Sequence, residues 1–179
     1  SRVMAGRMRE LGAGEVMVFP FGLEQLPPAP PEKDPDLFFA NRGLEPIYAP
    51  ERVLRVFAAM AALRPAARLV VANDGSLRAA LQMQAEAAGL AGRVQFVGRL
   101  DAGTQAGWYA RARWYLSLPR SDSVAVSVLE AMAHGMLPIL SDLPANRELV
   151  QDGVNGLILG DEELPRISPL TPSCTSSRL

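Results

Sequence analysis

The chain has 179 residues, of which 49% are hydrophobic and 21% charged, and its formal net charge is −1. This length and balance predict one soluble globular domain, and the arginines are too scattered to suggest nucleic acid as a partner. One cysteine, Cys174, and one histidine, His134, exclude an internal disulfide and a Cys/His zinc site. No apolar run approaches the roughly 20 residues that cross a bilayer, and no signal-peptide pattern is found. We therefore expect a cytoplasmic protein that uses no metal, whose full-length form associates with a membrane at most peripherally, at its inner face.

Residues 1–35 are expected to precede the main domain. Residues 2–11 have the period of an amphipathic helix that ends at Gly12, and residues 16–19 (VMVF) predict a short strand. Four of the five residues at 27–31 are prolines, which favours a stiff, extended linker. We infer that the chain begins inside a larger structure.

Strands and helices alternate over residues 36–162, the predicted domain. Apolar runs predict strands at 37–40, 69–72, 94–97, 114–118, 137–140 and 157–159, and helical periods lie between them at 51–63, 77–88, 104–112, 127–133 and 146–150. This alternation predicts an α/β fold, a doubly wound Rossmann-like parallel sheet with helices on both faces. Residues 163–179, with three prolines and four serines, are expected to form an irregular tail.

Ligands of an open parallel sheet bind at the carboxyl ends of its strands, where helix N-termini offer free N–H groups. The richest such loop is residues 117–135 (SLPRSDSVAVSVLEAMAHG), where Asp122 lies in the loop and Glu130 in the first turn of the predicted helix, eight positions later. Both carboxylates can face one crevice, one of them accepting ribose hydroxyl protons. Diphosphate oxygens would face the N–H groups of Ser123, Val124, Ala125 and Val126. Arg42, after the strand at 37–40, could bind a phosphate through a two-pronged hydrogen bond.

Each of these residues also has a purely structural interpretation. Ser127 and Glu130 fit a capping box, in which Glu130 only caps its helix. Asp122 could form an Asx-turn, and Arg42 could be a surface residue paired with Glu45. His134, Asp142, Pro144 and Glu148 are expected to serve helix ends and turns.

The segment 121–159 (SDSVAVSVLEAMAHGMLPILSDLPANRELVQDGVNGLIL) resembles the C-terminal domain of family 4 glycosyltransferases, which are retaining enzymes of the GT-B fold. The family's pattern is an acidic residue, seven others, then Glu followed by Ala-Met-Ala and Gly. Asp122, Glu130, Ala131, Met132, Ala133 and Gly135 match it. Weaker matches are VFPFG ending at Gly22, NRGLEPIY around Arg42, LVVANDG ending at Gly75 and VQFVGRL ending at Leu100, so that the resemblance covers residues 15–160.

The resemblance implies roles for the candidate residues. Glu130 would bind the ribose, Asp122 and the N–H groups of Ser123 to Val126 would face the donor sugar, and Arg42 would neutralise the diphosphate without a metal. The chain departs from the family at three places. Asp122 stands where many members have Glu, Ile47 stands where a Lys commonly follows the Arg by five residues, and residues 73–75 (NDG) replace Gly-Asp-Gly.

Two functions of different classes remain open from the sequence. The first is the donor-binding half of a glycosyltransferase of polysaccharide or lipopolysaccharide biosynthesis, which transfers a sugar from a nucleoside diphosphate to a glycan or lipid-linked acceptor. It would need a missing N-terminal acceptor domain and would not turn over alone. The second is a non-catalytic nucleotide-binding or interaction domain. A nicotinamide-dependent oxidoreductase is disfavoured, because no G-x-G-x-x-G turn is present.

Overall fold

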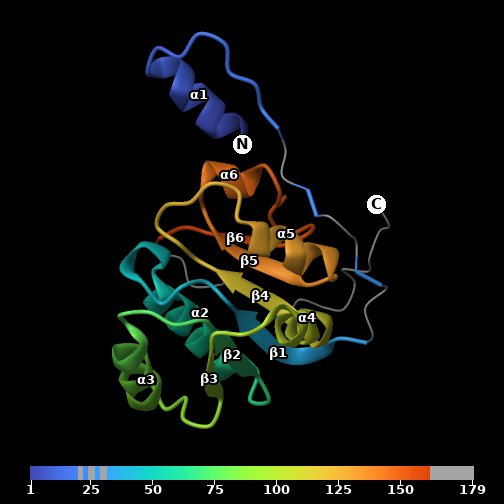
Figure 1. Cartoon of the computed structure of the whole chain (residues 1–179). Coiled ribbons are helices and arrows are strands. Elements are labelled where there is room, and N and C mark those ends of the chain that lie inside the picture. The colour runs from blue at the N-terminus through green and yellow to red at the C-terminus, as the bar shows by residue number, and fades with distance from the viewer. Residues whose placement is uncertain (20–21, 24–26, 29–31, 162–179) are drawn as a thin grey trace.

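The computed structural model describes residues 1–19, 22–23, 27–28 and 32–161. Its centre is a sheet of six parallel strands in the order β3-β2-β1-β4-β5-β6 (Figure 1). The strands are β1 (Asp34–Ala40), β2 (Arg68–Ala72), β3 (Val94–Gly98), β4 (Ala112–Ser117), β5 (Leu137–Ser141) and β6 (Leu157–Leu159). The order reverses direction between β1 and β4, which creates a crevice at the carboxyl ends of these two strands.

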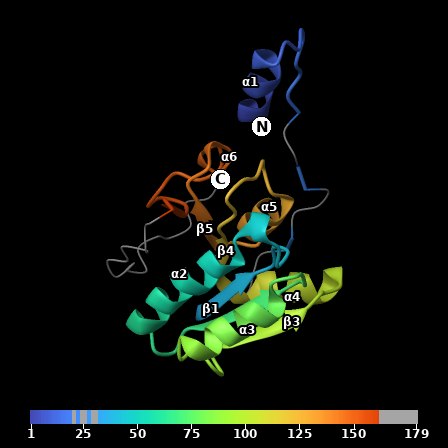
Figure 2. The same ribbon diagram turned by 90° about the vertical axis from the view of Figure 1, so that its left-hand side faces the viewer.

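Helices cover both faces of the sheet, so the predicted doubly wound fold is confirmed (Figures 1 and 2). One face packs against α2 (Pro50–Leu63) and α3 (Arg78–Ala87), and the other against α4 (Ala102–Arg111) and α5 (Val126–Ala133). The remaining helical elements are α1 (Arg2–Glu10), the 3-10 turn η1 (Pro46–Tyr48) and α6 (Pro144–Arg147).

The central strand β1 shows why the predicted strands are continuous apolar runs. Successive side chains of a strand point to opposite faces. Phe38 therefore packs edge-on against Phe57 of α2, with ring centroids 5.5 Å apart, whereas Phe39 packs against Tyr109 of α4 at 5.4 Å. Both phenylalanines are fully buried, since each face of the sheet has its own core.

Two sequence predictions are wrong in detail. Residues 16–19 form no strand, and Met17 and Phe19 remain 77% and 74% exposed. A strand needs a hydrogen-bonded neighbour, and no strand of the described residues pairs with this segment. The short helix predicted at 146–150 forms at 144–147 instead, because the fixed φ of Pro144 suits the first position of a helix.

The predicted tail at 163–179 lies outside the residues that the structure describes. The predicted linker is described only in part: Pro27 and Pro28 have no regular structure, and the prolines at 30 and 31 lie outside the described residues. Within the described ranges, no helix combines the length and the apolar character that crossing a membrane requires.

Candidate functional site

Arg42 and Asp122 meet above the crevice where the strand order reverses. Arg42 follows β1 and Asp122 lies in the loop after β4, and Arg42 Nη2 lies 2.6 Å from Asp122 Oδ2. The two side chains are 19% and 18% exposed, so the pair is partly shielded from water but open to a ligand. The alternative pairing of Arg42 with Glu45 is wrong, because Glu45 accepts hydrogen bonds from the backbone and the hydroxyl of Ser76 at 2.9 and 2.5 Å.

The guanidinium of Arg42 has further partners and one unused donor. It lies 4.5 Å from the ring centroid of Tyr48, and its Nη1 donates weakly to Ser127 Oγ at 3.4 Å. Arg42 Nε is buried and finds no acceptor in the described part of the chain. A buried donor left unpaired costs about 1–3 kcal/mol, so Arg42 is not fully satisfied by the described residues.

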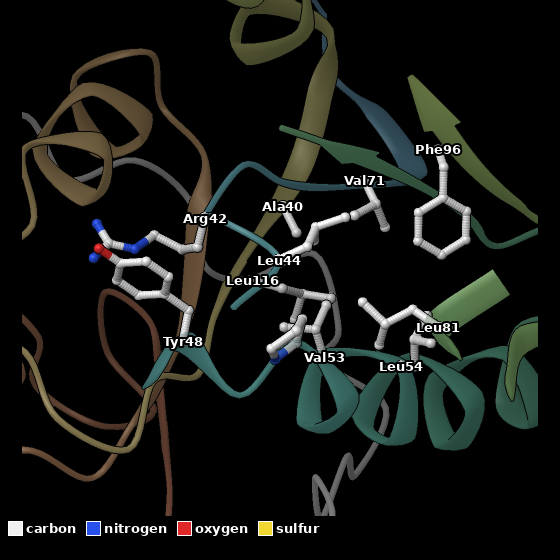
Figure 3. A pocket seen from close by; sticks show the side chains of 11 residues that line it. Ala40, Arg42, Leu44, Tyr48, Val53, Leu54, Val71, Leu81, Phe96 and Leu116 are labelled. Carbon is white, nitrogen blue, oxygen red and sulfur yellow. The ribbon is translucent and has the colours of Figure 1, made fainter. Parts of the chain in front are cut away.

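A cavity lies between the sheet and helices α2 and α3, beneath Arg42. Figure 3 shows Arg42 and Tyr48 together at one end of it and Leu81 and Phe96 at the other. Its volume is only about 20 Å³ and its lining is mostly apolar, which is room for about one water molecule. A nucleotide is far too large to enter it.

The loop that carries Arg42 is braced by residues 73–75. Leu44 donates its N–H to the carbonyl of Asp74 at 3.0 Å, and Leu77 donates to the carbonyl of Leu44, also at 3.0 Å. A Cβ on Gly75 would lie 2.4 Å from the Leu44 carbonyl oxygen. The glycine of this NDG segment is therefore required for the close approach of the two loops.

Helix α5 begins at the same rim with free amides. Its N-cap residue is Ala125, which provides no side-chain cap. Of the four predicted N–H groups, that of Ser123 donates to Asp122 Oδ1 at 2.8 Å, whereas those of Val124, Ala125 and Val126 find no acceptor among the described residues. These three amides, at the positive end of the helix dipole, can bind an anion.

Glu130 lies in the second turn of α5, one turn later than predicted, because the helix begins at Val126. The capping-box alternative is wrong. Ser127 is already inside the helix, and the Glu130 side chain does not accept from the backbone N–H of Ser127. Instead, Glu130 Oε2 accepts a hydrogen bond from the hydroxyl of Tyr109 at 3.0 Å. The carboxylate therefore belongs to the rim, where it is fixed by a buried phenol.

Sequence reasoning missed a set of buried polar side chains that joins these groups. The hydroxyl of Tyr115 lies 2.7 Å from Asn41 Oδ1 and 2.9 Å from Ser127 Oγ, and Asn41 Nδ2 donates to the hydroxyl of Tyr109 at 2.8 Å. Burial raises the pKa of Tyr115 to about 12. Burial, together with Tyr115 and Glu130, also raises the pKa of Tyr109. The available signal was one tyrosine in the predicted helix 104–112 and one in the predicted strand 114–118, because a buried hydroxyl needs a partner.

His134 lies at the C-terminal end of α5, as expected. Its Nδ1 is 2.8 Å from the carbonyl of Glu130, and its ring centroid lies 5.3 Å from that of Tyr109. Gly135 follows with a φ of 72°, the left-handed conformation that ends many helices. Within the part of the chain that the structure describes, no cluster of three or more His, Cys, Asp or Glu residues is arranged to hold a metal ion.

Comparison with known proteins connects this geometry to a family. The family described as "Glycosyl transferases group 1" matches residues 24–164. The Vi polysaccharide biosynthesis protein VipC/TviE of Salmonella typhi is 32% identical over 100 residues, which are 55% of this chain and 17% of that relative.

Solved structures share the fold at lower identity. A mutant of S. aureus TarM in complex with Fondaparinux, α-GlcNAc-glycerol and UDP aligns with a TM-score of 0.82 and 13% identity over 92% of this chain and 33% of TarM. The lipopolysaccharide outer core galactosyltransferase WaaB aligns with a TM-score of 0.70 and 20% identity over 90% of this chain and 47% of WaaB. Anabaena HepE in complex with UDP-glucose aligns with a TM-score of 0.63 and 20% identity over 73% of this chain and 36% of HepE.

The chain spans less than half the length of each of these proteins. Its family match nevertheless covers most of the chain, from the linker to the last strand of the sheet. The chain belongs to the group 1 glycosyltransferases, and its sheet is a Rossmann-like domain of the GT-B type.

Proposed function

We propose that this domain binds the nucleoside-diphosphate sugar donor of a retaining glycosyltransferase at the rim between β1 and β4. The observation that carries the proposal is the convergence of one guanidinium, three free helix amides and two carboxylates on that rim. A nucleotide sugar presents the matching groups, an anionic diphosphate and a set of hydroxyls. TarM and HepE, which share the fold, are bound to UDP or UDP-glucose in their structures.

The diphosphate is assigned to Arg42 and the start of α5. Charge-assisted hydrogen bonds from a guanidinium contribute about 1.5–3 kcal/mol each, and a helix N-terminus adds about 0.3–1 kcal/mol, more where it is sheltered. The free amides of Val124, Ala125 and Val126 supply donors for phosphate or sugar oxygens. The amide of Ser123 joins them only if Asp122 releases it.

The carboxylates are assigned to hydroxyl groups of the donor. Glu130 would accept from the ribose, and Asp122 would face the sugar. During transfer the bond between the anomeric carbon and the diphosphate oxygen breaks, and its electron pair leaves with the nucleoside diphosphate. Arg42 and the helix dipole stabilise the charge that develops there, and no metal is assigned a role. The acceptor oxygen then bonds to the anomeric carbon on the same face and gives its proton to the departing diphosphate oxygen, so that the configuration is retained.

Acceptor contacts are assigned to a further domain. This chain spans 33% of TarM and 47% of WaaB, and positioning of both reactants supplies much of the rate in bimolecular transfer. We therefore expect this chain to bind the donor nucleotide and to transfer no sugar alone. The acceptor class proposed is a glycan or a lipid-linked glycan.

The second candidate is a nucleotide-binding domain without catalysis. It is favoured by Ile47, which is 56% exposed where the family commonly has a lysine. Replacement of Glu130 by Ala in a full-length enzyme separates the two candidates. Loss of transfer supports the catalytic assignment, and undiminished transfer refutes the role of Glu130. A wild-type full-length protein that binds the nucleotide but transfers no sugar supports the second candidate.

Calorimetric titration with UDP, GDP, ADP and CDP tests the donor site directly. We expect one of them to bind the wild-type chain and Arg42→Ala to weaken that binding by at least tenfold, because a charge-assisted bond is lost. Arg64→Ala is the matched control, since Arg64 pairs with Asp36 at the opposite edge of the sheet, 2.8 Å away. A folded sample that binds none of the four at millimolar concentration would refute the proposal.

A further inference from the structure

A continuous chain of buried hydrogen-bonding groups connects the two ends of the candidate site. We name Ser127, Tyr115, Asn41 and Tyr109 the tyrosine relay. It starts at Arg42 Nη1, 3.4 Å from Ser127 Oγ, and ends at Glu130 Oε2, 3.0 Å from the Tyr109 hydroxyl. The three links between are 2.9, 2.8 and 2.7 Å long.

Counting protons fixes the direction of every link. An ionised carboxylate carries no proton and each tyrosine hydroxyl carries one, so Tyr109 donates to Glu130 at 3.0 Å, with the carbonyl of Ser127 as a longer second acceptor at 3.4 Å. The oxygen of Tyr109 then accepts from Asn41 Nδ2, which leaves Asn41 Oδ1 to accept from Tyr115. With its proton used there, Tyr115 accepts from the hydroxyl of Ser127, whose oxygen accepts from Arg42.

The opposite orientation of Asn41 fails the same count. If Asn41 Oδ1 faced Tyr109, the phenol would have two oxygen acceptors, Asn41 Oδ1 at 2.8 Å and Glu130 Oε2 at 3.0 Å, and only one proton to donate. One of these two close oxygen–oxygen contacts would then have no hydrogen bond. Such an unpaired buried contact is costly. Because the pKa of both tyrosines is raised, neither ionises near neutral pH and the order of donors persists. All bonds therefore point from the cation toward the carboxylate.

The ring of Tyr109 is held independently of its hydroxyl. It packs edge-on against Phe39 at 5.4 Å and lies 5.3 Å from the ring of His134, and Lys33 Nζ donates to its backbone carbonyl at 2.5 Å. Tyr109 is 2% exposed. A phenylalanine in its place keeps the packing and removes the hydroxyl, which is both the donor to Glu130 and the acceptor of Asn41 Nδ2.

We propose that Tyr109, oriented by Asn41, is a positioning residue that holds Glu130 Oε2 and so presents Oε1 to a ribose hydroxyl of the donor. No group among the described residues donates to Oε1. A free glutamate side chain would lose rotamer freedom on binding, whereas this one is already fixed by the phenol. The inference rests on the proposed function, because it assumes that the nucleotide binds at this rim.

The test compares two probes, UDP and 2′,3′-dideoxy-UDP, by calorimetry on the wild-type chain and on Tyr109→Phe. We expect the wild-type chain to prefer UDP because Glu130 accepts from the ribose. In Tyr109→Phe we expect the affinity for UDP to fall about tenfold, the size of one hydrogen bond to a charged group, and the affinity for the dideoxy probe to stay the same. The preference for UDP is therefore the readout.

Met60→Ala is the control for a merely structural effect. Met60 is buried in the core on the α2 face, so its truncation destabilises the fold without touching the relay, and the preference for UDP should survive. If Tyr109→Phe keeps the wild-type preference, or loses affinity for both probes equally, the inference is overturned while the donor site stands. If the wild-type chain binds neither probe and none of GDP, ADP and CDP, the proposed function fails and the inference fails with it.

Discussion

Asp122 pairs with the guanidinium to which a donor diphosphate is assigned. The two side chains lie 2.6 Å apart and are less than a fifth exposed, so their attraction is screened less than that of a surface pair. A diphosphate must therefore replace or share this partner. Asp122 is in this sense an internal competitor for phosphate as well as a candidate contact for the sugar.

Asp122→Asn separates these two roles. Removing the negative charge should tighten the binding of free UDP roughly fivefold, corresponding to about 1 kcal/mol for a partly shielded pair. The same change should lower sugar transfer in a full-length enzyme, because the contact to the sugar loses its charge. Calorimetry with UDP and a transfer assay measure the two effects.

The matched control is Asp36→Asn. Asp36 pairs with Arg64 at 2.8 Å, with both side chains about a third exposed, at the amino ends of the strands. It should leave UDP affinity unchanged. Weaker UDP binding in Asp122→Asn would show that Asp122 supports the phosphate site and does not compete for it.

At the scale of elements, the loop after β1 is held in place by the loop after β2. Two backbone hydrogen bonds join them through Leu44, and Gly75 fits only because it has no side chain. Gly75→Ala would place a methyl group 2.4 Å from the Leu44 carbonyl oxygen, so one of the loops must move. We expect a loss of about 3 kcal/mol in the free energy of unfolding, at the upper end of overpacking effects, and weaker UDP binding because Arg42 shifts.

Denaturant unfolding measures the stability change. Gly14→Ala is the control, since a Cβ there would meet nothing within 4 Å and the φ of Gly14 is not positive. Wild-type stability in Gly75→Ala would mean that the two loops adjust independently.

The same elements show what could be predicted from the sequence. β1, β2 and β4 are buried on both faces, so they must be continuous apolar runs, and such runs are visible without coordinates. The apolar residues at 16–19 give the same signal, but a strand also requires a neighbour, which no local pattern reveals. The sequence predicts that Arg42, Asp122 and Glu130 lie near one another because the carboxyl ends of parallel strands share one edge.

The relay could not be found in this way. Its members come from the loop after β1, from α4, from β4 and from α5, and their hydroxyl and amide partners are fixed only by the packing of these elements. The capping box at Ser127 and Glu130 failed for the same reason, because tertiary hydrogen bonds took both side chains.

At the scale of the whole molecule, α1 lies apart from the sheet beyond α6 (Figure 1). Glu148, the residue that ends α6, accepts hydrogen bonds from the backbone N–H groups of Arg2 and Val3, both at 3.2 Å. The carboxylate thus adds to the local cap, in which Ser1 Oγ accepts from the N–H of Met4 at 3.3 Å, at the first turn of α1, where a negative charge is favoured. Val3, Met4 and Met8 of the same helix remain exposed, so this polar contact has little apolar packing to support it.

Docking of α1 should therefore depend on the charge of Glu148. Burial alone would raise the pKa of Glu148, but the N–H donors of Val3 and Arg2 hold it below its ordinary value of 4.5. A carboxylate with a lowered pKa stabilises the docked state fully above that ordinary value, and its contribution is lost as the pH falls through the lower, docked-state value. Glu148→Gln should loosen α1 at neutral pH as acid does in the wild-type chain.

Limited trypsin digestion after Arg7 and Arg9 reports on this docking. We expect Glu148→Gln to be cut about two to five times faster at neutral pH, since a carboxylate at a helix N-terminus contributes about 0.3–1 kcal/mol. Glu86→Gln, the same change on the exposed side of α3, should be cut at the wild-type rate. Equal cleavage of all three proteins would mean that α1 is held by the packing of Ala5, which is 2% exposed, and that the charge of Glu148 is not needed for docking.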